Sequence, residues 1–307
     1  MFVGGKMTAK IFNIARSSLH DGNGIRTVVY MKGCTLHCQW CHNPESISPE
    51  TEILFDKKRC IKCGRCVDIC PNKNIIFLDN MIYKSDNCSF CMKCVGDCPN
   101  KALSSCGEDM TPKEVFAEII KDKHYYKESN GGVTFSGGEC LLFPTFLLEL
   151  LKMCRNSGIN TAVETALNVK WDSIEAVRNY IDTFIIDIKH YDSELHKQYT
   201  GSGNKLIISN FNNISRIHPS IIIRIPLIPN VNDTDDNLIN TAKLINTFGN
   251  GIKIVELLKY NNLAASKYTA LGIKPPVFAD HEQSDGFMEQ KCNLIKEYVR
   301  DTINVIY

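Results

Sequence analysis

The sequence predicts an α/β fold in which a parallel sheet of six strands is interrupted by a small cysteine-rich insert. Short apolar runs alternate with amphipathic helical stretches along most of the 307 residues, which is typical of a parallel sheet. Eleven of the fifteen cysteines fall in three tight runs, and two of these runs lie between residues 53 and 108. We therefore expect a main domain built from residues 1–52 and 109–307, and an insert over residues 53–108.

Six apolar runs are expected to form the strands, and helices are expected over stretches such as 113–123 and 143–156. The strands are predicted at 25–34, 132–137, 159–164, 183–189, 220–228 and 251–258. The first strand leads directly into the first cysteine run. Because α/β sheets and barrels keep their sites at the carboxyl ends of the strands, we expect the site there.

The composition excludes several classes of partner. A net charge of +1 gives no electrostatic basis for binding nucleic acid or an acidic membrane surface. No apolar run reaches 18 residues, and the N-terminus is too polar for a signal peptide, so we expect a cytoplasmic monomer. Disulfide frameworks belong mostly to short secreted chains, so the cysteines indicate metal binding in a reducing compartment.

The second and third cysteine runs share one spacing, C-x2-C-x2-C-x3-C-P, at an offset of 28 residues, and PNK follows both. This duplication is the pattern of bacterial two-cluster ferredoxins, in which the fourth cysteine of each run binds the other run's cluster. The spacing predicts one [4Fe–4S] cluster on Cys60, Cys63, Cys66 and Cys98. It predicts a second on Cys88, Cys91, Cys94 and Cys70.

A pair of zinc sites is the alternative for these eight cysteines, since C-x2-C pairs also bind zinc. Zinc leaves the trailing proline and the repeated x3 spacing unexplained, so the ferredoxin pattern is favoured. We expect the apolar stretches NIIFL (74–78) and MIY (81–83) to form a hairpin against the clusters.

The first run, GCTLHCQWCHNPES (33–46), places Cys34, Cys38 and Cys41 at C-x3-C-x2-C, and no fourth cysteine follows until Cys60. Three thiolates leave one iron of a [4Fe–4S] cluster open to a non-protein ligand, as in catalytic zinc sites. With Trp40 before the last cysteine, the stretch strongly resembles the motif of the radical S-adenosylmethionine superfamily. This resemblance implies a partial (β/α)6 TIM-like barrel and three clusters in all. It also implies reductive cleavage of S-adenosylmethionine to a 5′-deoxyadenosyl radical.

Longer stretches resemble the activating enzymes of glycyl radical enzymes: residues 18–46, GGVTFSGGE, VETALNV, DIKHYD, RIPLIPNVND and SKYTALG. The resemblance implies abstraction of an α-hydrogen from one glycine of a large partner enzyme. From the duplicated ligand set we expect the insert to pass electrons from a ferredoxin or flavodoxin to the catalytic cluster; the alternative is that its clusters brace the fold or shape the partner interface. The predicted partner is trans-4-hydroxy-L-proline dehydratase, with 4-hydroxyphenylacetate decarboxylase, choline lyase and glycerol dehydratase as alternatives.

The site residues are assigned from the positions of this sequence that match the motifs of the family. By resemblance, Cys34, Cys38 and Cys41 hold the catalytic cluster, Lys189 belongs to the catalytic set, and Glu164 and Asp187 lie near a monovalent cation. The S-adenosylmethionine site would be lined by Trp40, His42, Gly137, Gly138, Glu139, Asp187, Lys189, Arg224 and Asn261. Two of these features have simpler interpretations: SGGE as a turn and DIK as a charged strand end. Arg224 lies amid five β-branched residues and needs a buried anionic partner, for which the methionyl carboxylate would serve.

Two departures from the family pattern stand out. Glu164 replaces an Asp, and because Glu is longer, the geometry around the cation is expected to differ from the family's. Asn261 replaces a His, and an amide cannot take a charge at that position.

Two rival functions are also considered: a radical enzyme acting directly on a small molecule, and an electron carrier. An electron carrier would have no use for the three-cysteine loop or for SGGE. The stretch HDGNGIRT (20–27) favours an activating enzyme over a radical enzyme that acts on a small molecule.

Overall fold

All six predicted strands are present in the computed structural model, which describes residues 2–3, 6–78, 81–84 and 88–307. They lie side by side, all parallel, in the order in which they occur along the chain. In that order they are β4 (Arg26–Met31), β10 (Gly132–Gly137), β11 (Asn160–Thr165), β12 (Thr183–Asp187), β13 (Ile221–Pro226) and β14 (Ile252–Leu258).

Three further strands that the sequence analysis did not predict extend this sheet to nine. At one edge β15 (Asn304–Ile306) lies parallel to β14. At the other edge β3 (Ala9–Ser18) pairs antiparallel with β4, and β9 (Glu108–Met110) pairs antiparallel with β3. The short strands β1 (Phe2–Val3) and β2 (Lys6–Met7) form a separate hairpin.

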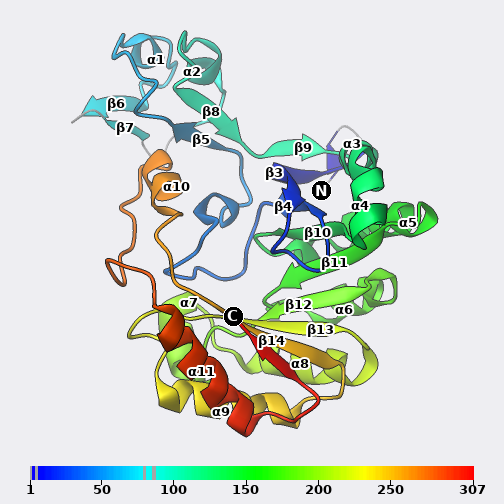
Figure 1. Cartoon of the computed structure of the whole chain (residues 1–307). Helices are drawn as coiled ribbons and strands as arrows, with labels where there is room; N and C mark the ends of the chain where they lie inside the picture. Colours follow the sequence, from blue (N-terminus) through cyan, green and yellow to red (C-terminus); the bar gives the residue numbers. More distant parts are fainter. Residues whose placement is uncertain (1, 4–5, 79–80, 85–87) are drawn as a thin grey trace.

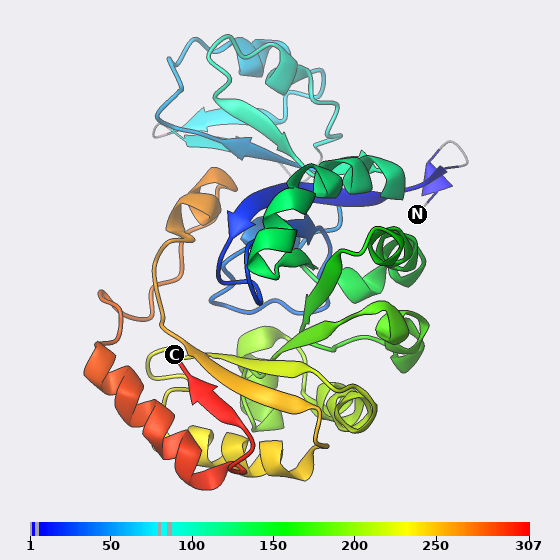
Figure 2. The same cartoon turned by 45° about the vertical axis from the view of Figure 1, so that its right-hand side comes forward.

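Helices follow the strands and cover the outer face of the curved sheet (Figure 2). The predicted helix at 113–123 appears as α3 (Pro112–Ile119) followed by the turn η2 (Ile120–Asp122), and Thr111 and Glu114 form a capping box at its start. The predicted helix at 143–156 is α5 (Pro144–Asn156). The other α-helices of the main domain are α4 (Lys123–Ser129), α6 (Trp171–Val177), α7 (Ser193–Thr200), α8 (Lys205–Ile217), α9 (Asp235–Thr247), α10 (Ala265–Ala270) and α11 (Asp285–Tyr298).

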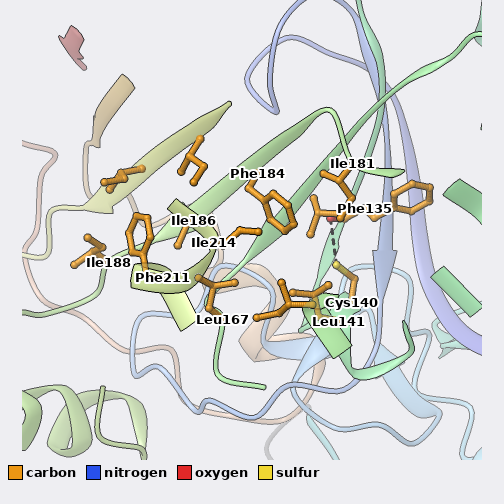
Figure 3. Packing of buried hydrophobic residues seen from close by; sticks show 14 of the residues in the cluster. Phe135, Cys140, Leu141, Leu167, Ile181, Phe184, Ile186, Ile188, Phe211 and Ile214 are labelled. Atoms are coloured by element: carbon orange, nitrogen blue, oxygen red, sulfur yellow. Dashed lines mark hydrogen bonds between the residues drawn. The ribbon is translucent and has the colours of Figure 1, made fainter. Parts of the chain in front are cut away.

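The main core lies between the sheet and these helices. Phe135, Phe184 and Phe211 contribute rings to it, and Figure 3 shows them within one continuous apolar layer. On α5, the buried side chains recur on one face of the helix, as expected for an amphipathic helix packed on a sheet. Among the described residues, no helix is both long and apolar enough to cross a bilayer.

The cysteine-rich segment has its own small core at one end of the molecule (Figure 1). Its base is the antiparallel pair β5 (Glu52–Phe55) and β8 (Leu103–Cys106). The predicted hairpin is confirmed as β6 (Ile75–Leu78) and β7 (Met81–Lys84). Two single-turn helices, α1 (Arg65–Asp68) and α2 (Lys93–Gly96), begin within the two cysteine runs.

Replacing Leu150 by Ala should lower the free energy of unfolding by about 2–5 kcal/mol, because this fully buried side chain of α5 would leave a cavity. The same change at Leu206, an exposed residue of α8, should cost less than about 0.5 kcal/mol. Denaturant unfolding under anaerobic conditions measures both. Equal losses for the two variants would contradict this account of the core.

Candidate active site at the carboxyl edge of the sheet

The first cysteine run forms a closed loop directly after β4. Gly33, with a φ of +100°, turns the chain there. The amides of Gly33 and Cys34 donate to the carbonyls of Ser46 and Ile47 at 2.7 and 3.1 Å, which closes the loop at its base. The amide of His37 donates to the carbonyl of Thr200, at the end of α7. The loop is thus anchored at both its base and its middle.

The three thiols of this loop lie in a partly buried environment. Burial raises the pKa of Cys34 and Cys38 to about 12 and that of Cys41 to about 11, although the charge of Lys189 lowers all three. Protein charges alone therefore leave the thiols protonated at neutral pH. Cationic iron would favour their thiolate forms, and an all-thiol donor set suits an iron–sulfur cluster.

The SGGE stretch at the end of β10 lies against this loop. The amides of Gly138 and Glu139 donate to the carbonyls of Met31 and Gly33 at 2.8 and 2.7 Å. A Cβ atom on Gly138 would lie 2.2 Å from the Gly33 carbonyl oxygen, and Gly137 has a φ of +113°. Both glycines are therefore required by backbone packing.

The side chain of Glu139 is used within the protein. The residue is 1% exposed, and its carboxylate accepts hydrogen bonds from the Thr165 hydroxyl and from the amides of Leu141 and Ala166. Burial raises the pKa of Glu139 to about 7. Glu139 thereby links the ends of β10 and β11, and only the main chain of SGGE remains for a ligand.

Charged side chains converge at the ends of β11 to β14. In the sheet register, Asp187, Arg224 and Glu256 are neighbours on three adjacent strands. The Arg224 guanidinium lies 2.8 Å from Glu164 and 2.7 Å from Glu256, and Lys189 lies 3.0 Å from Asp187. Arg224 therefore has anionic partners in the protein itself. Sequence analysis missed Glu256, although its place opposite Arg224 on the next expected strand was a usable signal.

The pKa shifts follow from this arrangement. Burial alone would raise the pKa of Glu164, but Arg224 and the Ser136 hydroxyl bring it below its ordinary value. Burial and the nearby Glu164 raise the pKa of Asp187, against the effect of Lys189. Burial opposes the charged forms of Lys189 and Arg224, yet their carboxylate partners raise the pKa of both.

Carboxylates outnumber cations in this centre. Asp21, 3.9 Å from Arg224, joins Glu164, Asp187 and Glu256, against the two cations Arg224 and Lys189. A ligand with a net positive charge suits such a surplus. S-adenosylmethionine, with its sulfonium, ammonium and single carboxylate, has this charge.

A hollow beside the cysteine loop brings together Trp40, His42 and Asn261 with further aromatic walls. The Phe278 ring meets Trp40 edge to face, with centroids 6.1 Å apart. The Trp40 indole N–H is buried and has no hydrogen-bond partner among the described residues. The Asn261 side chain accepts from the Leu263 amide. Aromatic walls and a spare donor fit a flat heteroaromatic group that offers an acceptor.

Helix α10, which includes part of the SKYTALG motif, fastens the same loop from the other side. The Lys267 ammonium donates to the His42 carbonyl at 2.9 Å and to the Asn43 side chain at 2.7 Å, and lies 3.2 Å from Glu45. The motif therefore has a structural role that its sequence did not indicate.

In the insert, the structure groups the same two cysteine quartets that the spacing predicts. One hollow of about 530 Å³ is lined by Cys60, Cys63, Cys66 and Cys98. Another of about 310 Å³ is lined by Cys70, Cys88, Cys91 and Cys94. Within the described part of the chain, no three His, Cys, Asp or Glu side chains are placed so as to hold a single metal ion.

The duplication extends to backbone geometry. Gly64 and Met92, 28 residues apart, both have left-handed backbones before α1 and α2. The Cys70 sulfur accepts a hydrogen bond from the Asn74 amide, and the Cys98 sulfur accepts one from the Ala102 amide, each at 3.2 Å. Such N–H···S bonds stabilise thiolates and influence cluster potentials.

Comparison with known proteins decides the family. The chain matches the radical SAM superfamily over residues 85–242, a 4Fe-4S single cluster domain over 20–77 and a 4Fe-4S dicluster domain over 59–102. It is 43% identical to the (2S)-3-sulfopropanediol dehydratase activating enzyme of Klebsiella oxytoca, covering 86% of this chain and 85% of that protein. The chain belongs to the radical SAM activating enzymes of glycyl radical enzymes.

Two other activating enzymes have similar identities. The trans-4-hydroxy-L-proline dehydratase activating enzyme of Clostridioides difficile is 41% identical over 85% of this chain and 87% of its own length. The choline trimethylamine-lyase activating enzyme of Oleidesulfovibrio alaskensis is 36% identical over 94% of this chain and 96% of its own length. A radical SAM methyltransferase from Sphaerobacter thermophilus shares the fold, with a TM-score of 0.54 at 12% identity over 98% of this chain and 77% of that one. The predicted radical SAM fold is thus confirmed.

Replacing Gly138 by Ala in this activating enzyme should displace the cysteine loop, because the added Cβ meets the Gly33 carbonyl. We expect the loss of up to roughly a third of the bound iron, the share of one four-iron cluster in three. Gly286→Ala is the matched control, since its Cβ on α11 would meet nothing within 4 Å. Iron and sulfide analysis measures both, and full iron content in Gly138→Ala would refute this role of the glycine.

Proposed function

We propose that this activating enzyme cleaves S-adenosylmethionine reductively and directs the resulting 5′-deoxyadenosyl radical to one glycine of a large partner enzyme. The observation that carries the proposal is the three-cysteine loop, held at the carboxyl edge of the sheet between a charged centre and an aromatic hollow. When bound, a cluster on Cys34, Cys38 and Cys41 supplies the electron for the cleavage.

The surrounding residues bind and orient the substrate in this proposal. Main-chain carbonyls of the SGGE stretch would accept from its methionyl ammonium, since the amides of Gly138 and Glu139 and the Glu139 carboxylate are already engaged. Asp187, Lys189 and Arg224 would balance its charges. Trp40, His42 and Asn261 line the hollow that would hold its adenine.

We further propose that the insert, residues 53–108, relays electrons from a ferredoxin or flavodoxin to the main domain, residues 1–52 and 109–307. Two cysteine quartets around separate hollows support two clusters there. Cys63 and Cys91 are exposed, which would bring each cluster near the surface where a reductant could dock. The enzyme would work as a cytoplasmic monomer.

The proposed partner is trans-4-hydroxy-L-proline dehydratase. The 41% identity to its activating enzyme supports this choice. The 43% identity to the activating enzyme of (2S)-3-sulfopropanediol dehydratase makes that dehydratase the main competitor. Glycine suits the target because it has no side chain and adopts unusual backbone conformations freely, so its segment can enter an open barrel edge.

An anaerobic panel of purified glycyl radical enzymes tests the function and the partner together. It contains the two dehydratases, choline lyase, 4-hydroxyphenylacetate decarboxylase and glycerol dehydratase, each with S-adenosylmethionine and dithionite. We expect a glycyl radical doublet in the EPR spectrum of hydroxyproline dehydratase, with about one deoxyadenosine per radical. Cys38→Ala should abolish it, whereas Cys292→Ala, at a cysteine outside the three runs, should not.

The possible outcomes of the panel separate the competing hypotheses. A radical only on another member would replace the partner and keep the activating function. No radical on any partner, together with many turnovers on a small molecule, would favour a radical enzyme that acts directly on such a molecule.

The relay has its own test. Replacing Cys63 and Cys91 together by Ala should slow glycyl radical formation far more with reduced ferredoxin or flavodoxin than with excess dithionite, because the small reductant can reach the catalytic cluster directly. A circular dichroism spectrum would confirm that the variant is folded. Equal losses with both donors would assign the insert a structural role.

A further inference from the structure

The carboxylates expected to hold a monovalent cation already have cationic partners. Two carboxylates near a bound substrate would repel each other unless a positive charge lay between them. In the structure Glu164 lies 2.8 Å from Arg224, and Asp187 lies 3.0 Å from Lys189. Each carboxylate is paired separately by a side chain of the protein.

Arg224 is held firmly in this position. The residue is 5% exposed and extends from β13, at the middle of the charged centre. Its three nitrogens donate to partners on three different segments: Glu164 of β11, Glu256 of β14 and the His20 carbonyl. A guanidinium has five N–H donors, so two remain for a substrate carboxylate. Arg224 can therefore form an ion pair with Glu164 and contact a ligand at the same time.

The length of Glu164 makes this pairing possible. A glutamate reaches about 1.5 Å further than an aspartate, one C–C bond. The second oxygen of Glu164 accepts from the Ser136 hydroxyl, so both carboxylate oxygens are engaged. Across the described residues, no three acidic, His or Cys side chains gather into a site for an ion. The side chains present do not fit a cation shared by Glu164 and Asp187.

We propose that the Arg224 guanidinium supplies the positive charge beside Glu164, so that this enzyme binds and cleaves S-adenosylmethionine without a monovalent cation. Substrate binding rests on the proposed function, whereas the pairing itself concerns the protein alone. Glu164 then acts as a positioning residue that orients Arg224 at the end of β13.

Glu164→Asp is the decisive variant, because the shortened carboxylate no longer reaches Arg224 and leaves space for an ion. Anaerobic, cluster-reconstituted proteins are compared in KCl, NaCl and tetramethylammonium chloride at equal ionic strength. Calorimetry measures S-adenosylmethionine affinity, and the melting temperature is measured without substrate. Glu175→Asp, the same shortening in an exposed pair with Arg178 on the surface, is the matched control.

For the parent enzyme and for Glu175→Asp, we expect the affinity for S-adenosylmethionine to vary less than about twofold among the three salts. We also expect the melting temperature of each protein to be the same in all three salts. For Glu164→Asp, we expect roughly tenfold weaker binding in tetramethylammonium than in KCl, and a melting temperature raised by K⁺. A parent enzyme that needs K⁺ or Na⁺ for either property overturns the proposal. So does a Glu164→Asp enzyme that is indifferent to the cation in both. If neither the parent enzyme nor the variants bind S-adenosylmethionine, the proposed function fails. The melting temperatures still show whether Arg224 replaces a cation beside Glu164.

Discussion

The close backbone contact between the cysteine loop and the end of β10 is the constraint on which the site depends. Two parallel strands, β4 and β10, end side by side, and the Gly33 carbonyl accepts from the Glu139 amide across that boundary. A side chain at Gly138 would occupy the space of that carbonyl. The Thr200 carbonyl of α7 and the Lys267 side chain of α10 hold the same loop from other sides, so contacts from several elements place its three thiols.

The same edge of the sheet collects charges that would be costly elsewhere. Burying an ion is tolerated only when it is paired and hydrogen-bonded. Arg224 meets this condition with one carboxylate from β11 and one from β14, and Lys189 meets it with Asp187. The surplus of carboxylates leaves the centre suited to a positively charged substrate, so the architecture and the chemistry of the family agree at this point.

The insert follows a different principle. Its core is small, and its cysteines face two separate hollows. Small domains of this size usually need metal or disulfide crosslinks for stability. The left-handed positions at Gly64 and Met92 show that the two repeats share backbone shape although only one of these positions is glycine. Cross-ligation of two clusters would further connect the two halves, whose apolar residues share one small core.

Local sequence patterns were enough to predict the six parallel strands, the hairpin and the cysteine groups. The strands and the hairpin depend on apolar runs of strand length, and the cysteine groups depend on the duplicated spacing of the ferredoxin pattern. The edge strands β3, β9 and β15 were not predicted, because an edge strand is selected by the neighbour it pairs with. The pairing of Arg224 with Glu164 was also beyond local patterns, since the two residues lie 60 residues apart on strands that are not adjacent. Only the tertiary structure brings these charges together, because strands distant in sequence end at one edge of the sheet.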